Sequence, residues 1–60
     1  MPADLRAALD AVPGTSAFFA KLSNSLQRYH VDNVNGAKSS DTRARRIEKT
    51  VALFLAGKQR

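Results

Sequence analysis

The stretch SSDTRARRIEKTVALFLAG, residues 39–57, carries the clearest helical pattern in the chain. Its apolar residues repeat at spacings of three, four and three, in the order Ala44, Ile47, Val51 and Phe54, with Leu55 widening the stripe. Ser39-Ser40-Asp41 offers cap residues before the stripe, and Gly57 follows it where a left-handed residue often ends a helix. The pattern therefore predicts an amphipathic helix whose apolar stripe faces a core.

Working outward from this stretch, a first helix is expected from about Pro2 to Ala11. Proline suits a first helical turn, and Leu5, Leu9 and Val12 share one face at spacings of four and three. Pro13-Gly14 should end this helix, since proline disfavours a helical residue before it.

Two further helices are expected between these ends. One runs from about Ser16 to Leu22, with Thr15 or Ser16 as its N-cap. The other begins after Ser23 or Asn24, where Asn24 and Gln27 resemble a capping box. Its apolar positions are Leu26, His30, Val34 and Ala37.

The length of 60 residues allows one domain, which we take as residues 1–60. Strand patterns are almost absent, so the sequence predicts an all-α fold, a compact small bundle of about four short helices. The expected core places Ile47, Val51 and Phe54 of the last helix against three positions of the others: Leu9, Phe18 or Phe19, and Leu26.

Side chains that carry chemistry are few. The chain has no cysteine and one histidine, which argues against a zinc site and against any disulfide. His30 falls within the apolar stripe of the third helix, which favours a core histidine with a hydrogen-bond partner over a general base. Asp10 or Asp32 is a possible partner. We expect no enzymatic activity, no cofactor and no bound metal.

The net charge of +5 is concentrated in residues 31–60, which carry seven basic and three acidic side chains. The candidate binding surface is a basic face that consists of Lys38, Arg43, Arg45, Arg46 and Lys49, with Leu53 beside them. On a helical wheel Arg45 and Lys49 point into water, whereas Arg43 and Arg46 lie where they can reach neighbouring helices. A cationic surface of this kind attracts polyanions, or it simply keeps a small domain soluble. Leu53 either contacts a partner, forms a second packing layer or is exposed.

The second half of the chain resembles the C-terminal module of the YdeI/OmpD-associated family, which is also labelled bacteriocin-protection. The resemblance rests on Val34, Ala37-Lys38, Asp41-Thr42-Arg43, Arg45-Arg46-Ile47 and Leu55-Ala56-Gly57-Lys58, and residues upstream also fit. It implies an all-α fold, a bacterial origin and a link to envelope stress or bacteriocin tolerance, but no catalytic residues. The family usually has tyrosine at His30 and tryptophan at Asn33, so we expect Tyr29 to turn inward in partial compensation.

These observations favour a small helical accessory module that binds a protein partner. The alternative is a non-specific nucleic-acid-binding protein that uses the basic fourth helix, although no aromatic residue is interleaved with the arginines for stacking. No apolar run is long enough to span a membrane and no secretory signal is recognisable, so we expect a cytoplasmic protein.

Overall fold

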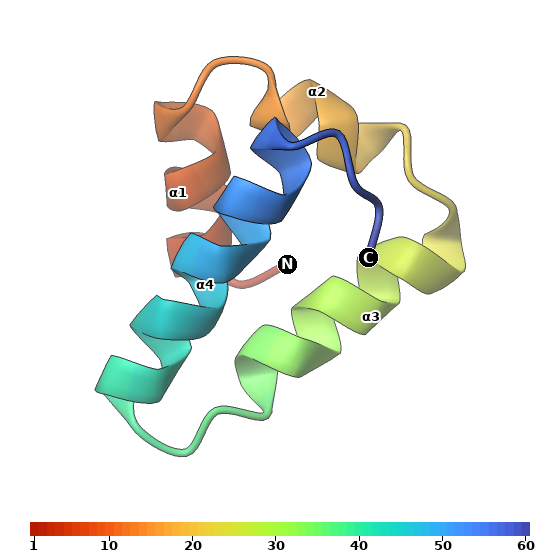
Figure 1. Ribbon diagram of the computed structural model, residues 1–60. Coiled ribbons are helices and arrows are strands. Elements are labelled where there is room, and N and C mark those ends of the chain that lie inside the picture. The colour runs from red at the N-terminus through yellow and green to blue at the C-terminus, as the bar shows by residue number, and fades with distance from the viewer.

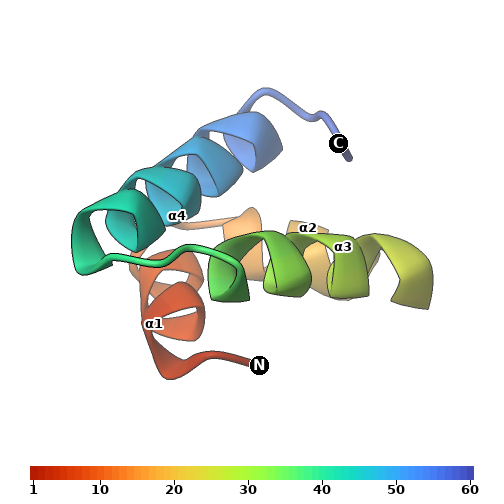
Figure 2. The same cartoon turned by 90° about the horizontal axis from the view of Figure 1, so that it is seen from below.

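Helix α4 (Ser40–Leu55) is the longest helix and packs against the other three, which are α1 (Ala3–Ala11), α2 (Thr15–Ala20) and α3 (Asn24–Asn35). The computed structural model describes all of residues 1–60. Figure 1 shows α1 alongside α4, with α3 running back from the end of α2 towards the start of α4. Turned by 90°, α4 lies across the other three helices (Figure 2). The predicted all-α bundle of four short helices is confirmed.

The core is built around Phe54, which is 3% exposed. The centroid of its ring lies 5.1 Å from that of Phe18, 6.0 Å from that of Phe19 and 5.0 Å from that of His30. The rings are tilted or edge-on to one another, at distances at which aromatic rings attract. The other buried apolar residues are Leu5, Leu9, Phe19, Leu22, Val34 and Ile47. Phe54 therefore connects α4 to both α2 and α3.

The buried face of α4 differs from the predicted stripe. Ile47, Thr50 and Phe54 are buried, whereas Ala44 is exposed and Leu55 is 62% exposed. Thr50 Oγ1 donates a hydrogen bond of 2.8 Å to the Arg46 carbonyl oxygen of the same helix. Because this bond satisfies the hydroxyl, the threonine can be buried among apolar groups. Helical spacing alone does not show that α4 is rotated so that Thr50, and neither Ala44 nor Leu55, faces the core.

Thr15 joins α1 to α2 and is 1% exposed. Its hydroxyl lies 2.8 Å from the Leu9 carbonyl oxygen and 2.9 Å from that of Val12, so one donor serves the end of α1. The predicted N-cap at Thr15 or Ser16 is wrong, because Gly14 holds that position with a φ of 89°. Thr15 caps the preceding helix instead.

The α2–α3 junction also differs from its prediction. Ser23 is the N-cap of α3 and accepts a 3.3 Å hydrogen bond from the Leu26 amide. The predicted pairing of Asn24 with Gln27 does not form. Gln27 Nε2 donates instead to the carbonyl oxygens of Phe19, at 3.0 Å, and Leu22, at 3.2 Å. A side chain of α3 thus satisfies carbonyl groups that α2 leaves free at its end.

Both ends of α4 follow the sequence prediction. Ser39 Oγ accepts a 3.2 Å hydrogen bond from the Thr42 amide. At the other end the Gly57 amide donates to Phe54 and the Lys58 amide to Leu53, at 3.0 and 3.1 Å. These two bonds, with a φ of 76° at Gly57, form a Schellman cap.

The Schellman cap turns the last residues back onto α3 (Figure 1). His30 is 2% exposed, as expected of a core histidine, and its Nε2 lies 2.7 Å from the Gln59 carbonyl oxygen. Since a carbonyl only accepts, Nε2 is the protonated ring nitrogen. The expected inward turn of Tyr29 is wrong: the residue is 43% exposed, and the Arg60 guanidinium lies 4.6 Å from the centre of its ring.

Replacing Phe54 with alanine tests the core assignment. We expect Phe54→Ala to lower the free energy of unfolding by about 3–5 kcal/mol, because it removes a buried ring from the contact of three helices. Leu55→Ala is the matched control, since the neighbouring side chain is 62% exposed, and it should change stability by no more than about 0.5 kcal/mol. Urea unfolding followed by circular dichroism measures both. Equal effects at the two positions would contradict the assignment.

Candidate functional site: the α1–α4 groove

An ion pair fixes the N-terminal ends of α1 and α4 against each other. Arg43 Nε and Nη2 both donate to the Asp4 carboxylate, the second at 2.9 Å, so the pair is bidentate. Arg43 Nη1 also reaches the Val34 carbonyl oxygen of α3 at 3.5 Å. One side chain of α4 therefore touches both neighbouring helices, as expected from the position of Arg43 on the helical wheel.

The pair also changes how both partners bind protons. The hydrogen bonds from Arg43 hold the pKa of the Asp4 carboxyl below its ordinary value of 3.8, with a smaller contribution from the Leu5 amide. In return the carboxylate raises the pKa of Arg43. Both groups are thus charged at neutral pH and neutralise each other.

The residues of the predicted basic face differ in exposure and in contacts. Arg46 Nη1 donates a 2.8 Å hydrogen bond to the Asn33 carbonyl oxygen in the last turn of α3, so its position is structural, like that of Arg43. Arg45 and Lys49 are exposed on α4, as expected, and Lys38 is exposed between α3 and α4. Leu53 is partly buried and packs on the core. Of the three possibilities for this residue, the structure therefore favours the second packing layer.

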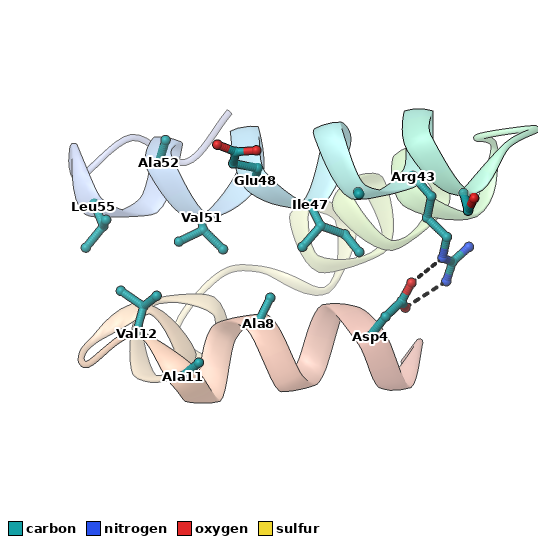
Figure 3. A pocket seen from close by; sticks show the side chains of 12 residues that line it. Asp4, Ala8, Ala11, Val12, Arg43, Ile47, Glu48, Val51, Ala52 and Leu55 are labelled. Atoms are coloured by element: carbon teal, nitrogen blue, oxygen red, sulfur yellow. Dashed lines mark hydrogen bonds and ion pairs between the residues drawn. The ribbon is translucent and has the colours of Figure 1, made fainter.

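A different surface stands out between α1 and α4, where an open groove of about 660 Å³ runs along both helices (Figure 3). We call it the α1–α4 groove. Its apolar lining consists of Ala8, Ala11 and Val12 from α1 and its end, and Ala44, Ile47, Val51, Ala52 and Leu55 from α4. The Asp4–Arg43 pair lies at one end of the groove, and Leu55 and Val12 lie at the other.

The charges that line the groove are almost balanced. Asp4 and Arg43 neutralise each other, which leaves Glu48 as the only lining charge without a partner within 4.0 Å. Glu48 also shares a neighbouring surface of α4 with Arg45 and Lys49. The groove is therefore suited to apolar side chains, with one anionic position at its edge.

The groove exists because α4 presents two apolar faces. Consecutive residues of a helix are about 100° apart, so Leu55 points well away from the core that Phe54 enters. Ala44, Val51 and Leu55 lie together on this second face. The sequence does contain a signal for the groove: the predicted apolar stripe of α4 is too wide to be buried entirely against the core. The contribution of α1 was missed, because alanines at Ala8 and Ala11 carry no distinctive pattern.

A family model described as bacteriocin-protection, YdeI or OmpD-associated matches residues 1–57. The chain belongs to this OmdA family. The match covers all four helices and every residue that lines the groove, so the groove lies within the OmdA domain itself. No curated protein and no solved structure matches the chain. Among its helices, none is long and apolar enough to cross a membrane.

The Asp4–Arg43 pair predicts a pH dependence of stability. A carboxyl whose pKa is lowered by folding stabilises the folded state above its unfolded pKa, and this contribution disappears as the pH falls through the folded pKa. Asp4→Asn should therefore destabilise the domain at pH 7. The difference from the wild type should shrink as the pH falls below about 4, because the unfolded chain then protonates Asp4 while the folded pair still resists the proton, and it should disappear once the folded carboxyl is protonated as well.

Urea unfolding at pH 7, 5, 3 and 2 measures this difference. Asp10→Asn is the control, since Asp10 lies 3.9 Å from Arg6 and both side chains are largely exposed; it should have little effect at any pH. A difference between wild type and Asp4→Asn that stays constant from pH 7 to pH 2 would show that the charged pair does not hold α1 to α4.

Proposed function

We propose that this OmdA domain is a protein-interaction module that binds an apolar helix of a protein partner in the α1–α4 groove. The observation that carries the proposal is the exposure of Leu55 and the alanines beside it on a second face of α4. Mostly apolar clefts of about 300–1,000 Å³ are typical of binding sites, and the groove has a volume of about 660 Å³. The groove contains no nucleophile–base pair, which favours binding over catalysis.

The shape of the groove favours a helix as the bound element. It follows two helices that run side by side, and small alanine side chains in its lining allow another backbone to approach closely (Figure 3). Helix-in-groove recognition uses apolar anchors spaced three and four residues apart, which such a lining accepts. The family description, bacteriocin-protection, supports an accessory rather than a metabolic role.

The basic surface supports the nucleic-acid alternative less well. Two of the arginines, Arg43 and Arg46, are engaged within the domain. Arg45 and Lys49 are free to contact phosphates, but Glu48 shares their surface and reduces its positive charge. We therefore propose the groove, and not the basic face, as the main binding surface.

The groove proposal is tested by capture from a lysate of the source cells, with the folded domain immobilised and bound proteins quantified by mass spectrometry. Leu55→Glu should reduce capture of the partner by tenfold or more, because it places a charge on an apolar surface. Ala7→Glu introduces the same group on an exposed position of α1 outside the groove, and it should leave capture unchanged. Capture that is identical for all three proteins would contradict the proposal.

The paired variant Arg45→Ala/Lys49→Ala tests the nucleic-acid alternative. Both side chains are exposed, so the free energy of unfolding should change by less than about 1 kcal/mol. Protein capture through the groove should persist. A nucleic-acid function would show instead as binding to DNA or RNA at low salt that weakens steeply as salt rises and is lost in this variant.

A further inference from the structure

We propose that a small hollow between α3, α4 and the residues after α4 binds a phosphate group, at a site separate from the α1–α4 groove. We call it the α3–α4 hollow. Its volume is about 160 Å³, and none of its lining residues also lines the groove. It is smaller than the clefts of about 300–1,000 Å³ that bind larger ligands, so it suits a single small group rather than a helix.

The rim of the hollow carries hydrogen-bond donors and no acid. Tyr29 and Asn33 of α3, Lys49 of α4 and Arg60 all line it and are exposed. Neither Lys49 nor Arg60 takes part in an ion pair. The acids next to Asn33 and Lys49 in the sequence, which are Asp32 and Glu48, line other hollows. Two cations and two neutral donors therefore surround one space without an anion to compensate them.

The floor of the hollow is already satisfied within the domain. His30 and Thr50 line the floor and are 2% and 3% exposed. His30 Nε2 donates to the Gln59 carbonyl oxygen at 2.7 Å, and the Thr50 hydroxyl donates to the Arg46 carbonyl oxygen at 2.8 Å. The capacity to bind an anion thus lies on the rim, and the floor gives the rim a fixed base.

The chain after α4 holds Arg60 in place before an anion arrives. The bond between His30 and Gln59 fixes the residue before Arg60, and the Arg60 guanidinium lies over the Tyr29 ring, 4.6 Å from its centre. Stacking on an aromatic face leaves the N–H donors in the plane of the guanidinium free. Because Arg60 is already positioned, less side-chain freedom is lost on binding.

The charge on the rim favours a phosphate group over a carboxylate. A carboxylate carries one negative charge and would leave one of the two cations uncompensated. A phosphate group carries about 1.5 to 2 negative charges at pH 7 and offers at least three acceptor oxygens, which arginine and lysine bind as charge-assisted acceptors. Inorganic phosphate and a phosphate monoester share this chemistry.

NMR titration of the ¹⁵N-labelled full chain with sodium phosphate tests the proposal, at constant pH of about 7.5 and ionic strength of about 0.15 M. The amides of Tyr29, Asn33 and Lys49 and the imidazole of His30, the only histidine, should shift and saturate with a Kd of about 1–5 mM. Acetate should bind at least fivefold more weakly. Phosphoserine distinguishes the sources: tighter binding than phosphate supports a monoester as the ligand, and weaker binding supports the free ion.

Matched alanine variants test the rim. Lys49→Ala and Arg60→Ala should each weaken phosphate binding about fivefold, whereas Arg45→Ala and Lys58→Ala, which remove the same charge at exposed positions outside the hollow, should change it less than about twofold because salt screens distant charges. Tyr29→Phe keeps the ring under the guanidinium and should weaken binding less than Tyr29→Leu. Circular dichroism checks that each variant keeps its helices.

Three results would overturn the proposal. The first is shifts that grow linearly with phosphate and do not saturate by about 20 mM, which is at least fourfold above the expected Kd. The second is acetate binding as tight as that of phosphate. The third is an equal effect of all four alanine variants, which would show diffuse attraction to a basic domain rather than a site. None of these results bears on the α1–α4 groove.

Discussion

The contact that the rest of this domain depends on is the packing of Phe54 against α2 and α3. The ring lies within about 6 Å, centroid to centroid, of Phe18, Phe19 and His30. A chain of 60 residues without disulfides has little buried surface to spare. Once Phe54 fixes the rotation of α4, the neighbouring Leu55 must face elsewhere. The core and the groove are therefore two consequences of one helix orientation.

Much of the fold could be predicted from local patterns. The four helices, the cap at Ser39 and the turn at Gly57 follow from residue preferences that act within a few positions of the chain. The errors arose where a side chain serves a neighbouring element. Thr15, at the start of α2, caps the end of α1. Gln27 of α3 caps the end of α2 and not the start of α3. Sequence spacing does not reveal such contacts, because they depend on how the helices meet.

The candidate site was harder to predict than the fold. The arginine cluster drew attention as a binding face, yet two of its members, Arg43 and Arg46, hold α4 to α1 and α3. Basic residues are easy to recognise in a sequence, whereas a groove lined by alanines is not. Leu55 widens the predicted apolar stripe, and only the packing of Phe54 shows that its side chain points outward.

We propose that the apolar face of the α1–α4 groove is a contact surface rather than an incidental hollow. Amide chemical shifts of the ¹⁵N-labelled domain, recorded before and after addition of a lysate of the source cells, test it residue by residue. We predict that the shifts which change cluster at Ala8, Ala44, Val51 and Leu55, and that those of α2 and α3 stay constant. Changes confined to α3, or no change at the groove residues, would show that the groove is not a contact surface.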